Sequence, residues 1–199
     1  MRPELLRLKV PGALRYHRTL YNAELRRPIP GMVAAIFDLA TRRHIGLHRT
    51  YLADGPNGWR KAPVETPKMV LGSYQGGIVP LTRGATGRTW SQMRGGEMLL
   101  LAEGIENALI VAQLHPDWRS AAYIAANNLV RLRLPQEIEA VCLVRDRDGE
   151  NWAVQEDREI AIGQWLEEGL TVTEWYPPEG VKDAADWWQL EGEEWHAQG

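Results

Sequence analysis

The chain has 199 residues, of which 44% are apolar, a formal net charge of −3 and a single cysteine, Cys142. This composition predicts one substantial folded domain or two small ones packed together, and it excludes a disordered chain, disulfide bonds and a cysteine zinc site. No stretch approaches the roughly 20 uncharged apolar residues of a membrane span, and the N-terminus lacks the apolar core of a signal peptide, so we expect a cytoplasmic protein without membrane contact.

The first half of the chain has the pattern of a small, mostly β region. Prolines occur at several positions within residues 1–30, and they predict an irregular N-terminal segment with at most a short helix. The β-rich runs 32–39 and 44–52, with a short polar segment between them, predict a β-hairpin. Because side chains alternate along a strand, His48 and Arg49 are expected on opposite faces of the second run. A loop rich in Gly and Pro and further short strands are expected after this hairpin.

From residue 96 the pattern changes to strands that alternate with helices. Apolar runs predict four strands, and helical spacing of apolar residues predicts two helices between them. The strands are expected at residues 96–104, 121–128, 139–146 and 170–176, and the helices at 105–115 and 151–168. This order predicts a mainly parallel α/β sheet flanked by helices. We therefore divide the chain into a small, mostly-β basic subdomain (1–95), an α/β domain (96–190) and a C-terminal tail (191–199).

Charge divides the chain at the same place. Residues 1–95 hold 16 Lys and Arg against 5 Asp and Glu, a net charge of +11, whereas residues 96–199 hold 7 against 21, a net charge of −14. A basic half suits a polyanion, and acidic side chains in the other half attract cations if several converge on one site. The alternative is that both halves are solvated faces that attract each other.

Acidic residues stand at the ends of two of the predicted strands, directly after their apolar runs. Glu103 with Gly104 follows the first apolar run, and Asp146 and Asp148 follow the third. In parallel sheets ligands bind beyond the carboxyl ends of the strands, so these carboxylates can aim at one point. Three unpaired negative charges there are costly unless a cation joins them. Oxygen ligands without cysteine or a histidine cluster favour Mg²⁺ or Mn²⁺.

The segments LLLAEGIENAL and, further along the chain, LVRDRDG resemble the paired motifs of the Toprim domain, which bacterial-type primases, type IA and type II topoisomerases and certain nucleases share. The resemblance covers residues 96–190 and is closest to primases and to the primase-like Toprim proteins of phages and mobile elements. PPEGVKDAADWW resembles a Pro, Gly, Lys, Asp pattern near the end of the primase Toprim domain. Upstream, IGLHRTYL and WRKAPVETPKMVLG are similar to the strand, basic loop and lysine pattern that precedes Toprim in bacterial primase cores.

The resemblance implies roles for individual residues. Glu103 takes the part of the family's glutamate, a general acid or base and indirect metal partner. Asp146 and Asp148 complete the catalytic set as metal ligands, and Asp183 is an additional acid near the metal. Four basic side chains are expected to contact template phosphate or incoming nucleotide: Arg49, Lys61, Lys68 and Lys182. The alternative for Arg49, Lys61 and Lys68 is ordinary surface charge.

The function implied by the resemblance is metal-dependent nucleotidyl transfer: primase-like synthesis of short RNA primers on single-stranded DNA from nucleoside triphosphates, with Mg²⁺ or Mn²⁺ as cofactor. A helicase or another replication protein is the implied protein partner. Because the chain has neither the cysteines of a zinc-binding template-recognition module nor the length for a helicase-interacting region, we expect a minimal core. Two alternatives stay open: a Toprim-type metal-dependent nuclease, and a non-catalytic nucleic-acid-binding replication accessory.

Other residues near these motifs are interpreted first as structural. We expect His48 to pack against its neighbours, and Glu106 to be a solvated acid at a helix start. Trp59, beside two basic residues, is a candidate for stacking on a base, with packing as the alternative. The arginines that flank the first aspartate of the Asp-x-Asp motif, Arg145 and Arg147, are expected to point away from the metal ligands.

Overall fold

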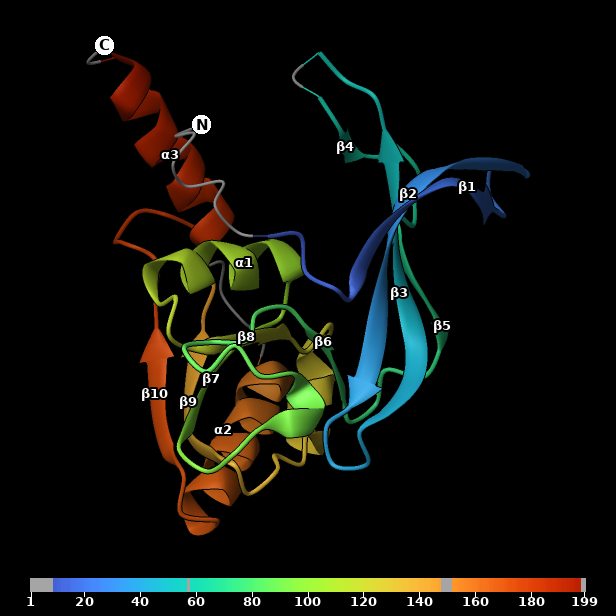
Figure 1. Cartoon of the computed structure of the whole chain (residues 1–199). Coiled ribbons are helices and arrows are strands. Elements are labelled where there is room, and N and C mark those ends of the chain that lie inside the picture. The colour runs from blue at the N-terminus through green and yellow to red at the C-terminus, as the bar shows by residue number, and fades with distance from the viewer. Residues whose placement is uncertain (1–8, 57, 148–151, 198–199) are drawn as a thin grey trace.

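One sheet runs through both halves of the chain in the computed structural model (Figure 1). The structure describes residues 9–56, 58–147 and 152–197. Within these ranges the strand order is β10-β9-β7-β8-β6-β2-β3-β4, with β1 paired to β2 and β5 paired to β3. The strands are β1 (Leu14–Asn22), β2 (Arg27–Asp38), β3 (Arg43–Ala53), β4 (Arg60–Lys61), β5 (Lys68–Gly72), β6 (Gly77–Pro80), β7 (Glu97–Ala102), β8 (Arg119–Ala122), β9 (Ile138–Val144) and β10 (Thr171–Trp175). The helices are α1 (Ile105–Leu114), α2 (Trp152–Glu167) and α3 (Ala184–Ala197), with short 3-10 helices η2 (Trp90–Gln92) and η3 (Ala126–Arg131).

Antiparallel strands form the N-terminal half, as the sequence predicts. The expected hairpin is confirmed, because β2 and β3 pair antiparallel along most of their length. The expectation of an irregular N-terminal segment is wrong: β1 is a nine-residue strand antiparallel to β2. Most residues of β1 are exposed, so it lacks the apolar alternation that signals a strand. It forms because pairing with β2 satisfies backbone N–H and C=O groups that both strands otherwise leave unpaired.

The C-terminal half contains the expected parallel sheet. Strands β10, β9, β7 and β8 are neighbours in this order, and each adjacent pair is parallel. The predicted strand at 121–128 is only partly correct, because β8 ends at Ala122 and the chain turns into η3. Sheet and helices together confirm a mixed α/β fold whose parallel segment follows a mostly-β region.

Strand β7 is buried on both faces, which explains its continuous apolar run. Leu99 and Leu101 join the core on one face, and Leu100 and Ala102 join the core on the other. The first core includes the buried side chains that α2 contributes, Ala161 and Trp165. The second includes those that α1 and α3 contribute, Ile105, Ala108, Val111 and Ala184. The parallel sheet therefore lies between α2 on one side and α1 with α3 on the other (Figure 1).

Strand β6 connects the two halves of the sheet. Its residue Ile78 pairs with Phe37 of β2, and the next residue, Val79, pairs with Ala122 of β8. One hydrophobic core extends across this junction; it contains Leu14, Ala34 and Ile36 from the N-terminal half and Leu100, Ile105, Val111 and Val144 from the C-terminal half. The two halves are consequently packed together around shared apolar side chains, and a site between them has fixed walls.

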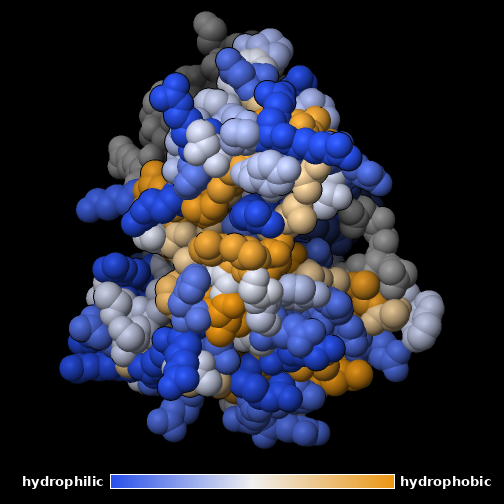
Figure 2. All heavy atoms as spheres, turned by 90° about the vertical axis from the view of Figure 1, so that its right-hand side faces the viewer, coloured by the Kyte–Doolittle hydropathy of each residue, from blue (hydrophilic) through white to orange (hydrophobic). Residues whose placement is uncertain are grey.

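The β-rich half presents a mixed outer face. A band of hydrophobic side chains crosses this face, with hydrophilic side chains above and below it (Figure 2). Met69 and Leu71 of β5 are among the exposed large apolar residues of the described chain.

In the other half, Cys142 is buried in β9, and burial raises the pKa of its thiol, as expected for a structural cysteine. Among the described residues, the helices are too short or too polar to cross a membrane.

Candidate functional site

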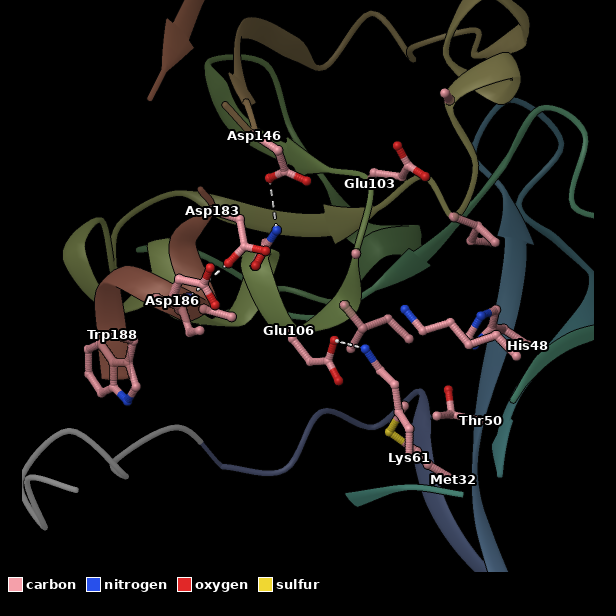
Figure 3. A pocket seen from close by; sticks show the side chains of 18 of the residues that line it. Met32, His48, Thr50, Lys61, Glu103, Glu106, Asp146, Asp183, Asp186 and Trp188 are labelled. Atoms are coloured by element: carbon pink, nitrogen blue, oxygen red, sulfur yellow. Dashed lines mark hydrogen bonds and ion pairs between the residues drawn. The ribbon is translucent and has the colours of Figure 1, made fainter. Parts of the chain in front are cut away.

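A cavity of about 820 Å³ lies where the two halves of the chain meet (Figure 3). Its walls come from the carboxyl ends of β7 and β9, the first turn of α1 and the start of α3 on one side, and from β2 to β5 on the other. The lining includes Met32, His48, Thr50, Lys61, Lys68, Glu103, Gly104, Glu106, Asn107, Ile124, Asp146, Asp183, Asp186 and Trp188. Parallel strand ends open onto this cavity, which is the usual position of a ligand site in such sheets.

Three of the four predicted acidic residues line this cavity. Glu103 follows β7 and is exposed, and Asp146 follows β9 and is half-buried. The two carboxylates lie at one sheet edge because β7 and β9 are parallel neighbours. Asp183 precedes α3, where its Oδ1 accepts a hydrogen bond of 2.8 Å from the backbone N–H of Asp186. The fourth acid, Asp148, lies outside the described residues.

Asn107 is a site residue that sequence reasoning missed. It is buried, and its Nδ2 donates a hydrogen bond of 3.0 Å to Oδ1 of Asp146 (Figure 3). Asn107 lies four residues after Glu103, in the first turn of α1, whereas Glu103 precedes the N-cap Gly104; both line the cavity. That spacing was the available signal, but only the pairing of β7 with β9 shows which carboxylate the amide contacts. The hydrogen bond fixes the orientation of the Asp146 carboxylate.

The arginines beside Asp146 turn away from the cavity, as expected. Arg145 is buried and donates a hydrogen bond of 2.6 Å to Glu174, while its guanidinium lies over the ring of Tyr176. Arg147 donates from Nε to the carbonyl oxygen of Pro177 at 2.8 Å. The backbone N–H of Arg147 also bonds the carbonyl oxygen of Lys182. This last contact joins the segment after β9 to the segment before α3, and so holds Asp146 and Asp183 on the same side of the cavity.

Basic and neutral polar side chains of the N-terminal half form the opposite wall. Lys61 and Lys68 both line the cavity, as does His48, which we expected only to pack. Glu106 is not simply solvated: its Oε2 lies 3.6 Å from Nζ of Lys61, across the cavity between the two halves (Figure 3). Both side chains of this pair are about half exposed, at 48% and 56%.

The other predicted nucleic-acid contacts lie elsewhere. Arg49 is on the face of β3 opposite His48, as the alternation predicts, and it is not part of the cavity lining. Lys182 is exposed just before Asp183 and also lies outside the lining. Trp59 is exposed and packs against Tyr16, with ring centroids 5.7 Å apart. The cavity therefore brings together two of the four predicted basic residues.

The imidazole of His48 is neutral at physiological pH. Burial, and secondly the positive charge of Lys68, lower its pKa to about 4, while the negative charge of Glu106 acts in the opposite direction. Its Nδ1 is buried and has no hydrogen-bond partner among the described residues. The basic wall thus contains an uncharged polar ring beside its lysines.

Backbone geometry adds hydrogen-bond donors to the acidic wall. Gly104 is the N-cap of α1 and has no side chain to cap the helix, so the N-terminus of α1, where backbone N–H groups lack partners within the helix, lies at the cavity wall. Ile124 has a positive φ of 78°, which is costly for a β-branched residue. Its N–H bonds the carbonyl oxygen of Glu103 at 3.0 Å, and this bond holds the turn after β7 in place.

The described carboxylates do not by themselves make a complete metal site. In the ranges that the structure describes, which omit residues 148–151, no three His, Cys, Asp or Glu side chains are grouped closely enough to hold a metal ion. The predicted acidic residues that line the cavity, Glu103, Asp146 and Asp183, offer oxygen atoms only. Oxygen donors are what Mg²⁺ and Mn²⁺ prefer, so the residues present fit such an ion in chemical type.

Comparison with known proteins separates the chain into two matched regions. Residues 98–194 match the Toprim domain family, and residues 3–81 match a domain of unknown function, DUF7146. No curated protein matches the sequence.

Among solved structures, the chain is similar to the primase fragment of the bacteriophage T7 primase-helicase protein (16% identity, TM-score 0.49, 85% of this chain and 61% of that one). It is similar to a DNA primase domain from Pseudomonas aeruginosa (16% identity, TM-score 0.49, 88% of this chain and 52% of that one). It is also similar to the E. coli primase catalytic core (17% identity, TM-score 0.43, 92% of this chain and 55% of that one). The chain thus spans between half and two thirds of the length of these structures. The family match agrees with the motifs after β7 and β9 and confirms the resemblance drawn from them: residues 98–194 are a Toprim domain.

Proposed function

We propose that this chain is a metal-dependent nucleotidyl transferase of the primase kind, which joins nucleoside triphosphates into short RNA on single-stranded DNA. One observation carries the proposal: a single cavity has carboxylates of the Toprim domain on one wall and lysines of the N-terminal half on the other. Such a cavity suits a ligand that carries both phosphate and a bound cation. In this proposal the protein acts in the cytoplasm with a helicase or another replication protein.

The acidic wall would hold the metal. Toprim domains generally bind divalent metal, and the ligands here would be Asp146, Asp148 and Asp183, with Glu103 close by. When bound, Mg²⁺ or Mn²⁺ neutralises the triphosphate and stabilises the leaving pyrophosphate. Glu103, exposed at the end of β7, would accept the proton of the attacking 3′ hydroxyl. Asn107 would keep the Asp146 carboxylate in one orientation through its hydrogen bond.

The basic wall would hold phosphate. Lys61 and Lys68 reach the cavity, and the N–H groups at the start of α1 are further donors for an anion. The ion pair between Lys61 and Glu106 is exposed and worth less than about 1 kcal/mol, so a phosphate can replace the carboxylate as the partner of Lys61. Lys182 and Arg49, which lie outside the cavity, would contact the DNA strand beyond it.

A primer-synthesis assay tests this proposal. Labelled single-stranded DNA is incubated with the four ribonucleoside triphosphates and Mg²⁺ or Mn²⁺, and the products are separated on a gel. We expect the wild type to make short oligonucleotides, and Glu103→Gln and Asp146→Asn to lose about 100-fold or more of this activity. Glu139→Gln is the matched control, because Glu139 is an exposed carboxylate of β9 outside the cavity; it should keep full activity.

The same gel separates the alternatives. If the wild type shortens the labelled DNA and both cavity variants lose this activity, the protein is a Toprim-type nuclease. If no product forms and all variants bind DNA equally, the protein is a non-catalytic accessory and the proposed transferase is wrong.

A further inference from the structure

His48 is an unexplained polar group in the cavity wall. Only 8% of the residue is exposed, and its buried Nδ1 has no hydrogen-bond partner in the described part of the chain. Buried polar groups in folded proteins are nearly always paired, because an unpaired one has lost its bonds to water. His48 also lines the cavity, so its imidazole is placed to contact a ligand bound there.

His48 lies in the same cavity wall as Lys61 and Lys68, the two lysines that are proposed to contact phosphate. Thr50 lies on the same face of β3, and strand pairing sets it beside Lys68 of β5 and Met32 of β2. In Figure 3, His48 and Thr50 lie across the cavity from Asp146 and Asp183, with Lys61 and Glu106 between them. A ligand whose phosphates contact the lysines and the acidic wall would therefore bring its remaining part toward His48.

The chemistry of this end of the cavity differs from that of the rest. Met32 is apolar, Thr50 is neutral, and the imidazole of His48 is uncharged at pH 7 because burial and the charge of Lys68 oppose its protonation. Next to Lys68, these neutral donors and acceptors and the apolar Met32 match a sugar with its hydroxyls or a nucleobase better than they match a further phosphate.

We propose that His48 is a specificity-determining residue that hydrogen-bonds the nucleoside part of a nucleoside triphosphate whose phosphates lie against Lys61 and Lys68. This inference rests on the proposed function, since it names which part of the substrate each region of the same cavity binds.

Calorimetric titrations in the presence of Mg²⁺ test the inference with two kinds of probe. The first is each of the four ribonucleoside triphosphates, and the second is inorganic tripolyphosphate. We expect His48→Ala to weaken binding of at least one nucleoside triphosphate about 5- to 10-fold, which is the contribution of one hydrogen bond. Tripolyphosphate binding should stay within about twofold, because it lacks the nucleoside. His48→Gln, whose amide can still hydrogen-bond, should recover part of the loss. Lys68→Ala should weaken both probes.

His44→Ala is the matched control, because His44 lies on the same strand but is exposed and outside the cavity lining. Thermal unfolding of each variant verifies that it is folded. Suppose that the wild type binds both probes. If His48→Ala then weakens the binding of both equally, or of neither, the inference is overturned and the proposed function still stands. If the folded wild type binds neither probe, the proposed function fails and the inference fails with it.

Discussion

The buried imidazole of His48 makes the stability of the folded chain depend on pH. Its pKa is about 4 in the folded chain and near 6.5 when the chain is unfolded, so between these values the unfolded state binds a proton that the folded state does not. Stability from this group is complete above pH 6.5 and is lost as pH falls toward 4. We expect it to lower the free energy of unfolding by about 2 kcal/mol at pH 5 relative to pH 7.

Urea unfolding of the wild type and of His48→Gln at both pH values measures this effect. The variant should lose less stability on acidification, by about 2 kcal/mol, because glutamine does not titrate. An equal loss in both proteins would show that other groups cause the pH dependence.

The hydrogen bond from Asn107 to Asp146 predicts a role in metal affinity. Groups that orient a metal ligand typically contribute 10- to 100-fold to the affinity, so we expect Asn107→Ala to weaken Mn²⁺ binding by about this factor. Calorimetric titration with Mn²⁺ measures it. Asn127→Ala is the control, since Asn127 is an exposed amide of η3 that does not line the cavity. Unchanged affinity in Asn107→Ala would mean that Asp146 needs no orientation or is not a ligand.

At the scale of elements, an ion pair inside the molecule connects β7 and β8. The side chain of Arg119 is fully buried, and its Nη2 lies 2.9 Å from Oε1 of Glu97. The same guanidinium donates to the carbonyl oxygen of Arg88 and to Thr86, and it lies over the ring of Trp90. The hydrogen bond from Arg119 is the main reason that the pKa of Glu97 is lowered. One side chain thus attaches the loop before β7 to the parallel sheet.

Removal of Arg119 should therefore be costly. We expect Arg119→Ala to lower the free energy of unfolding by about 3–5 kcal/mol, because it leaves the buried Glu97 carboxylate without its partner. The double variant Arg119→Met with Glu97→Leu should lose less, since no charge stays buried. Arg42→Ala, which breaks the more exposed pair with Glu137, should cost less than about 1 kcal/mol. Similar losses for Arg42→Ala and Arg119→Ala in urea unfolding would contradict this account.

At the scale of the whole molecule, the two halves depend on each other for their core. The apolar cluster around Leu100 and Val111 includes Ala34 and Ile36 of the N-terminal half, and β6 covers one edge of β8. A fragment of residues 96–199 would expose these apolar surfaces and an unpaired strand edge. We expect this fragment not to unfold cooperatively, in contrast to the full chain.

Circular dichroism during urea unfolding, together with binding of a hydrophobic dye, compares the fragment with the full chain. Loss of the cooperative transition and a gain in dye binding are the expected results. A fragment with a sharp transition and no dye binding would show that the Toprim half folds alone, and the shared core would then be an interface between independent domains.

The sequence by itself determined the α/β pattern of the second half and the acids at its strand ends. Strand β7 and helix α1 follow from local apolar spacing, and Glu103 and Asp146 follow from their places directly after apolar runs. These features could be predicted because each depends on residues that are close together in the chain.

Only the tertiary structure decided which side chains share the cavity. Alternation along β3 assigns His48 and Arg49 to opposite faces, but the face that lines the cavity depends on how β2, β3 and β5 pack against α1. Strand β1 and the contact of Asn107 with Asp146 likewise depend on partners far along the chain. The local pattern of apolar residues shows the periodicity of a helix or strand. The element that packs against each of its faces depends on contacts between residues far apart in the chain.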